Sequence, residues 1–210
     1  MSAASRAPLR SNRTTARARS RAALTVGAAV SALLVSACGS GGTSGGGGNT
    51  NFVTGTDGIA TVAKADRHDA PELSGRTVDG GQLDVDDYRG EVVVLNVWGS
   101  WCGPCRAEAK NFEKVHQDTK DQGVRFVGIN TRDTSTAAAL RFEEEQGVTY
   151  PSLYDPSGKL MLRFEKGTLN PQAIPSTLII DRDGKIAARA LQALSEEKLR
   201  KMLDPVMAEK

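Results

Sequence analysis

The sequence predicts an α/β domain built on a central mixed sheet, with helices on both faces of that sheet. The strongest indication is residues 92–97, a nearly unbroken apolar and β-branched run. A run without polar alternation indicates a strand that is covered on both faces, as in a parallel or mixed sheet. Strand and helix patterns then alternate along the chain, which is typical of βαβ units. Asp183-Gly184 stands between two further apolar runs and predicts a hairpin, which makes the sheet mixed.

Apolar periodicity and turn residues place the individual elements along the chain. Gly80-Gly81 predicts a β-hairpin between residues 76 and 85, ahead of the buried strand. Ser195 precedes two glutamates and starts the last helix. The elements expected between them are a helix from Gly103 to near Gly123, a strand at 124–130, a helix at 137–146 capped by Thr134 or Ser135, a loop with a short helical segment at 159–164, and strands at 177–181 and 185–191.

The charge distribution separates an unusual N-terminal stretch from an ordinary domain. The chain has 210 residues and a formal net charge of +2, and the residues before position 38 contain six arginines and no acid. Subtracting these six charges leaves −4 on the remainder of the chain. A mildly acidic domain lacks the basic face of a nucleic-acid-binding protein, so we expect no nucleic acid among its partners.

Residues 1–37 have the pattern of a secretory signal peptide. Residues 1–21 are rich in arginine, and the apolar segment at 22–37 is shorter than the roughly 20 residues of a membrane-spanning helix. The sequence at 34–39, Leu-Val-Ser-Ala-Cys-Gly, resembles a bacterial lipobox, in which the cysteine is lipidated and becomes the new N-terminus. Lipid on Cys38 would fix the protein to the outer face of a bacterial cell membrane. The alternatives are an ordinary cleaved signal that contains a cysteine, and an uncleaved anchor.

A flexible linker is expected between Cys38 and the folded domain. Residues 39–50 are nearly all Gly, Ser and Thr, which bury nothing and behave as a flexible coil. Residues 51–69 are polar without clear periodicity, and at least their first part is expected to be disordered. The lipidated cysteine and linker therefore span 38–69, and the folded domain is expected at 70–210.

Cys102 and Cys105 stand at the junction between the buried strand and the following helix. Unpaired N–H groups and the positive end of the dipole stabilise a thiolate at a helix N-terminus. Cys102 is therefore the expected nucleophile, and Cys105, one turn later, can attack a mixed disulfide formed on Cys102. Pro104 presets the helical φ angle, and Trp101 offers an apolar surface beside the nucleophile. The spacing thus predicts the redox-active disulfide of a thiol–disulfide oxidoreductase.

Two other uses of a C-x-x-C motif are disfavoured by the residues that are present. A structural zinc site needs four ligands, but no further cysteine follows and the only histidines are His68 and His116. A cysteine-protease type of nucleophile needs a histidine partner, and His116 lies about two to three turns beyond Cys105 on the same predicted helix. We therefore expect His116 on the surface, and we expect neither a metal nor a cofactor.

The residues around the cysteines resemble the thioredoxin superfamily, and more closely its extracytoplasmic TlpA/ResA/CcmG-like branch. The similarity covers residues 70–210. It rests on the C-G-P-C motif within 97–108 and on four short segments, Ala70-Pro71-Glu72-Leu73, Tyr88-Arg89-Gly90, Tyr150-Pro151 and Ile174-Pro175-Ser176-Thr177. The resemblance implies a thioredoxin-like three-layer fold with a central mixed sheet, an N-terminal β-hairpin extension, and an insertion before the strand that follows a cis-proline.

The resemblance also implies that the Ile174–Pro175 peptide bond is cis and lies beside the dithiol. In the family, this loop lets the substrate backbone pair with the residue at the position of Ile174 and keeps metals away from the cysteines. The alternative is a trans proline that merely opens the strand at 177. Asn96 stands where cytoplasmic thioredoxins have a buried aspartate, so that base is absent here.

Glu108 is the candidate for proton transfer at this site. It shares a predicted helical face with Phe112 and Val115, so its carboxyl is expected on the inner face, where desolvation raises the pKa. Such a carboxyl can exchange a proton with Cys105, a role associated with a glutamate at this place in the ResA-like branch. The alternative is a first-turn glutamate that only complements the helix dipole. Arg106, by contrast, is expected to be a solvated charge.

Together these features predict a membrane-tethered enzyme that reduces disulfides of exported proteins. The resemblance adds apocytochrome c as one substrate class and a membrane protein of the CcdA/DsbD type as electron donor. We expect the protein to be a monomer. An oxidant that forms disulfides could use the same residues, but Gly-Pro between the cysteines matches reducing thioredoxins and favours the reductase.

Two further functions remain as alternatives. A peroxiredoxin-like peroxidase shares the fold, but it requires a Pro-x-x-x-Thr-x-x-Cys setting that Trp98-Gly99-Ser100-Trp101 does not supply. A copper-binding protein of the Sco type has a wider cysteine spacing and a histidine far downstream, and no histidine follows His116 here.

Overall fold

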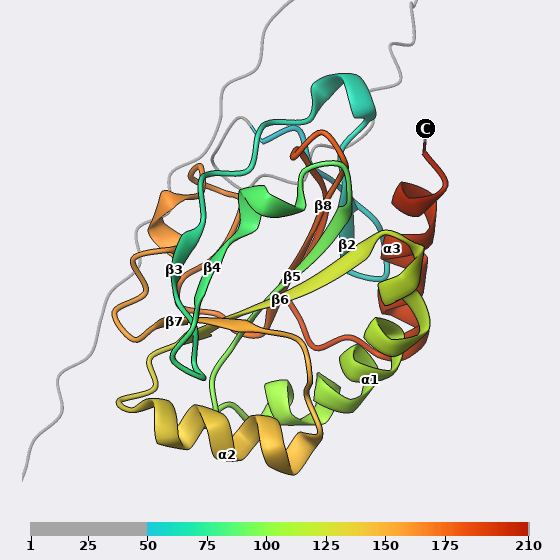
Figure 1. Cartoon of the computed structure of the whole chain (residues 1–210). Coiled ribbons are helices and arrows are strands. Elements are labelled where there is room, and N and C mark those ends of the chain that lie inside the picture. The colour runs from blue at the N-terminus through green and yellow to red at the C-terminus, as the bar shows by residue number, and fades with distance from the viewer. Residues whose placement is uncertain (1–49, 210) are drawn as a thin grey trace, which may run out of the picture. The chain divides into compact units, whose positions relative to one another are not determined.

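Residues 50–209, which the computed structural model describes, contain two sheets (Figure 1). The larger sheet is seven-stranded, in the order β1-β2-β9-β8-β5-β6-β7. β5 lies parallel to β6 and antiparallel to β8, so the predicted central mixed sheet is confirmed. The smaller sheet is the predicted hairpin. The strands are β1 (Val53–Thr54), β2 (Ile59–Thr61), β3 (Ser74–Arg76), β4 (Gln82–Asp84), β5 (Val92–Trp98), β6 (Val124–Thr131), β7 (Ser152–Asp155), β8 (Ser176–Ile180) and β9 (Ile186–Ala190).

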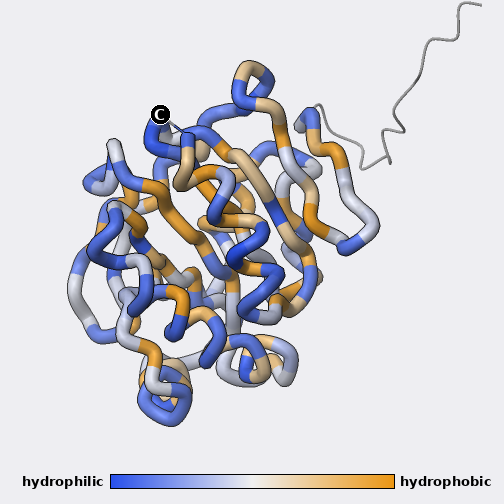
Figure 2. Tube along the Cα trace, turned by 90° about the vertical axis from the view of Figure 1, so that its right-hand side faces the viewer, coloured by the Kyte–Doolittle hydropathy of each residue, from blue (hydrophilic) through white to orange (hydrophobic). Residues whose placement is uncertain are grey.

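In the described part of the chain, the α-helices pack on one face of the large sheet. Successive side chains of a strand point to opposite faces, and Val94 of β5 shares a core cluster with Phe112 and Leu199 of two helices. On the same face, Phe142 stacks on Trp98 with 4.5 Å between ring centroids. Hydrophobic residues concentrate in the strands, whereas hydrophobic and hydrophilic residues alternate along the helices (Figure 2). The helices are α1 (Gly103–Thr119), α2 (Thr136–Gln146) and α3 (Glu196–Met207).

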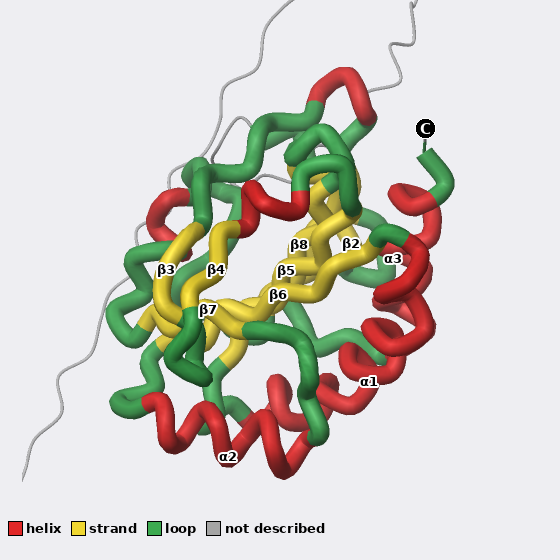
Figure 3. The backbone as a smooth tube through the Cα atoms, in the orientation of Figure 1, coloured by secondary structure: helices red, strands yellow, loops and turns green. Residues whose placement is uncertain are grey.

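The opposite face is covered by the hairpin and by short turns of 3-10 helix (Figure 3). Val93 of β5 points to this side and shares a core cluster with Leu73, beside the hairpin, and with Met161 in the insertion. The helical segment expected at 159–164 is a single 3-10 turn, Met161–Arg163. The three layers are therefore present, but the expectation of helices on both faces is wrong. The hairpin and the insertion already bury the second apolar face.

The large sheet contains one strand that the sequence pattern does not indicate. β7, expected as part of a loop, pairs in parallel with β6. It is four residues long and stands between Pro151 and Pro156, so no apolar run marks it. Its hydrogen bonds come from β6, and on the other edge the backbone N of Val78 donates to the carbonyl oxygen of Ser152 at 2.8 Å. The other predicted strands and helices are confirmed, with small shifts at their ends.

The folded domain begins before residue 70. β1 and β2 join the large sheet beside β9, and Phe52, Ile59 and Val62 are buried. The expectation that the linker extends to residue 69 is therefore wrong in its last part. These strands are only two and three residues long, and β2 is held by a strand more than a hundred residues away, so local periodicity cannot reveal them.

The predicted signal peptide at 1–37, the predicted lipidation site Cys38 and the Gly-rich segment up to residue 49 lie outside the described residues. Within residues 50–209, no helix is both long enough and apolar enough to cross a membrane.

Replacing Phe52 tests whether the segment before residue 70 belongs to the core. Phe52 is 7% exposed, and the guanidinium carbon of Arg189 lies 4.2 Å from its ring centroid. We expect Phe52→Ala to lower the free energy of unfolding by about 3 kcal/mol, because burial is lost and a cavity remains. Urea denaturation measures this change. The control is Val53→Ala, at a side chain 63% exposed, which should change the free energy by less than about 0.5 kcal/mol. Equal small effects would contradict a core role for this segment.

Candidate active site

The end of β5 and the start of α1 bring the two cysteines together. All seven residues of β5 are buried, and the chain leaves the strand at Trp98 to enter α1 at Gly103. Cys102 is the N-cap of α1, and its Sγ accepts a hydrogen bond of 3.2 Å from the backbone N of Cys105. Cys102 and Cys105 are joined in a disulfide. The pair therefore lies where the N–H groups of a helix N-terminus stabilise a thiolate.

The loop before β8 lies against this disulfide. The Ile174–Pro175 peptide bond is cis, as predicted. The Sγ atom of Cys102 lies 3.8 Å from the carbonyl oxygen of Ile174. Both cysteines are buried, whereas Trp101 is 53% exposed. The structure thus brings Ile174 to Cys102, and Trp101 supplies exposed aromatic surface next to the buried nucleophile.

Glu108 points into the protein from α1, as helical periodicity predicts. It is 2% exposed, and its carboxylate accepts hydrogen bonds of 2.9 Å from Asn96 Nδ2 and of 2.9 Å from the backbone N of Leu194. Burial raises the pKa of Glu108 to about 7, and the two hydrogen bonds, which favour the charged form, oppose this only in part. A first-turn glutamate that only complements the helix dipole would be exposed. Glu108 is instead a carboxyl that can both accept and release a proton near neutral pH.

A second buried carboxylate, that of Asp133, holds the loop that precedes the cysteines. It accepts hydrogen bonds from the backbone N of Ser100 at 2.9 Å, from Ser100 Oγ at 2.5 Å and from Asn130 Nδ2 at 2.6 Å. No sequence signal marks Asp133, because it stands in a polar stretch before α2 that is typical of any helix start. The backbone of Ser100 is therefore fixed to the end of β6.

Arg106 is exposed, as expected for a solvated charge, and its guanidinium binds Glu145 Oε2 at 3.0 Å and the carbonyl oxygen of Ser100 at 3.1 Å. One residue has surroundings that differ from the expected ones. His116 is half-buried rather than on the surface, with its ring 5.4 Å from that of Phe126 between centroids. This burial lowers the pKa of His116. On α1 the ring of His116 faces Phe126 of β6, whereas the predicted helical face placed His116 on the outside of the helix.

Glu143 on α2 is a further carboxyl whose burial raises its pKa, to about 7. It is hydrogen-bonded to Ser152, whose Oγ also accepts from the indole N of Trp98 at 3.2 Å. Trp98 belongs to the same core cluster as Cys102 and Cys105. The run of three glutamates at 143–145 gives no sign of which one faces inward, so the sequence alone does not identify Glu143.

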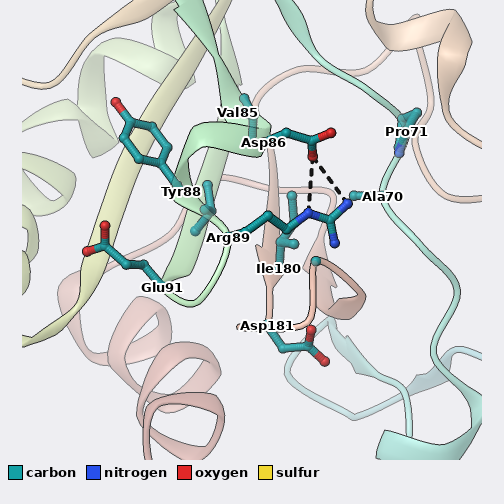
Figure 4. Close-up of a pocket in the computed structure, with 11 residues that line it drawn as sticks. Ala70, Pro71, Val85, Asp86, Tyr88, Arg89, Glu91, Ile180 and Asp181 are labelled. Atoms are coloured by element: carbon teal, nitrogen blue, oxygen red, sulfur yellow. Dashed lines mark hydrogen bonds and ion pairs between the residues drawn. The ribbon is translucent and has the colours of Figure 1, made fainter.

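Figure 4 shows a pocket at the opposite end of β5. It is lined by Val93, near the start of β5, and by Ile180, the last residue of β8. The cysteines follow the far end of β5, about 17 Å away at the rise of a β-strand. Arg89 in this pocket is paired with Asp86 at 3.2 Å. The pocket is therefore separate from the disulfide and its chemistry.

A buried disulfide at a helix N-terminus, beside a cis-proline loop, defines a thiol–disulfide oxidoreductase of the thioredoxin fold. The sequence pattern of the AhpC/TSA family matches residues 67–189. The chain belongs to this family.

Known proteins place the chain among the ResA-like members of this fold. The thiol-disulfide oxidoreductase ResA of Geobacillus kaustophilus is 27% identical over 157 residues, which are 75% of this chain and 84% of the relative. The solved structure of a DsbF homologue from Corynebacterium diphtheriae is 32% identical, has a TM-score of 0.67, and is matched over 73% of this chain and 96% of that chain. A secreted thiol-disulfide isomerase from Corynebacterium glutamicum is 30% identical, has a TM-score of 0.69, and is matched over 78% of this chain and 100% of that chain. The predicted TlpA/ResA/CcmG-like resemblance and the predicted oxidoreductase class are confirmed.

Glu108 should make the stability of the protein depend on pH. Burial raises its pKa from 4.5 to about 7 on folding. Its contribution to stability is therefore fully present below pH 4.5 and is lost as the pH rises through 7. This difference in pKa corresponds to about 3 kcal/mol. We expect the free energy of unfolding of the wild type to fall by about that amount between pH 4 and 8, relative to Glu108→Gln, in urea denaturation at each pH.

Glu144→Gln is the matched control, because Glu144 lies on α2 and is exposed. This variant should keep the pH dependence of the wild type. Parallel curves for the wild type and Glu108→Gln would show that Glu108 titrates in the folded protein as it does in water, and would contradict its assignment as a buried proton carrier.

Proposed function

We propose that this protein is a membrane-tethered, extracytoplasmic enzyme that reduces disulfides of exported proteins. Two opposing influences on the dithiol support reduction, rather than oxidation, of the substrate. The N-terminus of α1 stabilises the thiolate of Cys102, whereas the buried carboxylate of Glu108, one turn beyond Cys105, disfavours a second negative charge nearby. A dithiol whose thiolate is only modestly stabilised is a reductant rather than an oxidant. Gly103-Pro104 between the cysteines agrees with this direction.

The reaction consists of two thiolate attacks. The Cys102 thiolate attacks a substrate disulfide, so that a bond forms between Cys102 and one substrate sulfur while the other substrate sulfur leaves and takes up a proton. Deprotonated Cys105 then attacks Cys102, which releases the second substrate sulfur and forms the Cys102–Cys105 disulfide. Two electrons pass to the substrate; the first substrate sulfur takes its proton from water, and the second takes up the proton that Cys105 gave up. We assign to Glu108, three residues after Cys105 on α1, the role of accepting the Cys105 proton.

The substrate polypeptide is proposed to bind across the loops that flank Cys102. The cis Ile174–Pro175 bond presents the backbone of Ile174 to the nucleophile, with its carbonyl oxygen 3.8 Å from Cys102 Sγ. A substrate strand can pair with this backbone, as in the TlpA/ResA/CcmG-like proteins. Trp101 adds apolar contact next to it. Apocytochrome c, which carries a cysteine pair, is one substrate class that fits such a site.

The location follows from the N-terminal sequence. The signal pattern at 1–37 and the lipobox at Cys38 support export and attachment of a diacylglyceryl lipid. The Corynebacterium glutamicum relative is described as secreted, which agrees with export. A glycine-rich segment after Cys38 would let the domain reach partners near the membrane. Each turnover leaves Cys102 and Cys105 joined in a disulfide. A membrane electron donor of the CcdA/DsbD type is proposed to reduce this disulfide again.

The reduction potential of the Cys102–Cys105 pair tests the direction of electron flow. We expect a value closer to that of thioredoxin, about −270 mV, than to that of DsbA, about −120 mV. Equilibration in dithiothreitol and glutathione buffers, followed by alkylation and mass spectrometry, gives the potential, and insulin reduction gives the activity. Cys102→Ser is the control without a redox couple. A potential near −120 mV together with no insulin reduction would assign the opposite direction and refute the reductase.

Lipidation of Cys38 predicts where the protein is found in a bacterial host. We expect the full chain to sediment with membranes and to incorporate a palmitate analogue during growth. Cys38→Ser should lose the label, because the serine cannot form the thioether. Cys102→Ser removes a different cysteine and should be labelled like the wild type. Equal labelling of Cys38→Ser and the wild type would contradict a lipid on Cys38.

A further inference from the structure

The turn between β6 and α2 packs against the loop that precedes Cys102. It begins after Thr131, the last residue of β6, with Arg132 and Asp133. Because both oxygens of the buried Asp133 carboxylate accept hydrogen bonds from Ser100, the turn is tied to the residue two positions before Cys102. Parallel β5 and β6 end at the same edge of the sheet, which is why these distant segments meet.

Arg132 has a backbone conformation that arginine rarely adopts. Its φ angle is 59°, in the left-handed region that favours glycine. Such a conformation persists only where the surroundings determine it, and it concentrates at functional positions. Here the anchored Asp133 fixes the turn on one side, and the guanidinium carbon of Arg132 lies 4.7 Å from the ring centroid of Trp101 on the other.

Trp101 is held between Arg132 and Gly99. A Cβ atom on Gly99 would come within 2.7 Å of Trp101 Nε1, so the indole can occupy its place only because position 99 is glycine. The ring nevertheless remains about half exposed. Arg132 and Trp101 thus form one rigid, cationic and aromatic surface next to Cys102.

The charge of Arg132 has no carboxylate partner among residues 50–209. Its neighbour Asp133 is not available, because Ser100 and Asn130 already occupy that carboxylate. Arg106 offers a contrast within the same region, since its guanidinium is paired with Glu145 at 3.0 Å. An exposed guanidinium with free donors is suited to binding a carboxylate through two parallel hydrogen bonds.

We propose that Arg132 is a substrate-recognition residue, which binds a carboxylate side chain of the polypeptide close to the cysteine that Cys102 attacks. The proposal rests on polypeptide disulfides as substrates of Cys102, and it holds whichever way the electrons pass. The preferred substrates are then cysteines with an aspartate or glutamate near them in sequence, a preference that the dithiol alone does not produce.

Two disulfide-bonded reporter peptides test this recognition, identical except for Asp or Asn two residues from the reactive cysteine. The rate constant of each with the reduced protein is divided by its rate constant with dithiothreitol, which removes the effect of the aspartate on the peptide thiol itself. We expect the wild type to prefer the Asp peptide by about three- to fivefold at low salt, the range of an exposed ion pair. The preference should approach one at 1 M NaCl, where charges are screened within about 3 Å.

Substitutions separate the charge of Arg132 from its packing. Arg132→Gln should lose the preference, and Arg132→Lys should keep most of it. Arg106→Gln is the matched control and should keep it fully, because that guanidinium is already paired. A wild-type preference of one, or an unchanged preference in Arg132→Gln, would overturn the proposal, as would an equal loss of rate with both peptides. No exchange with either peptide in the wild type would refute the proposed function as well.

Discussion

The burial of β5 on both faces is the constraint on which the rest of the site depends. Because all seven of its residues are removed from water, the strand cannot change register without exposing apolar side chains. Its last residue therefore fixes where α1 begins and where Cys102 lies. β6 runs parallel and ends at this edge, and β8 runs antiparallel and begins there. One strand thus brings the Asp133 turn and the cis-proline loop to the same disulfide, although they are about forty residues apart (Pro175 and Asp133).

The same strand sets the balance of charge beneath the disulfide. Asn96 of β5 donates to the carboxylate of Glu108, and the backbone of Leu194 donates from the opposite side. These two donors favour the ionised carboxylate, and burial opposes it; burial dominates, since the pKa rises to about 7. An aspartate at position 96, as in cytoplasmic thioredoxins, would place a second acid against the first. With asparagine at position 96, β5 supplies a hydrogen-bond donor and α1 supplies the carboxyl of Glu108.

The predictable part of the site is the part that local patterns encode. The Cys102–Cys105 spacing and the helical face of Glu108 each depend on neighbours within a few turns of one helix, so the sequence indicates them directly. Resemblance to a family adds the cis-proline. β7 and the first two strands are too short to carry a periodic signal, and their hydrogen bonds come from distant strands. The same holds for Asp133 and Arg132, whose roles exist only because two parallel strands end together.

Trp98, the last residue of β5, and Trp101, in the loop that follows, show how packing and recognition can be told apart. Trp98 is 3% exposed, stacks on Phe142 and has its indole N hydrogen-bonded, so its contribution to the fold is complete. Trp101, three residues later, leaves about half of its surface in water and forgoes the hydrophobic stabilisation of burial. It is held there by Arg132, in a left-handed conformation that itself opposes folding. The contact between the Arg132 guanidinium and the Trp101 ring stabilises this arrangement only by the modest amount of an exposed cation–π pair. Both features occur beside Cys102, and under the proposed recognition the exposed surface that they share gains its further contacts from the polypeptide whose disulfide is exchanged.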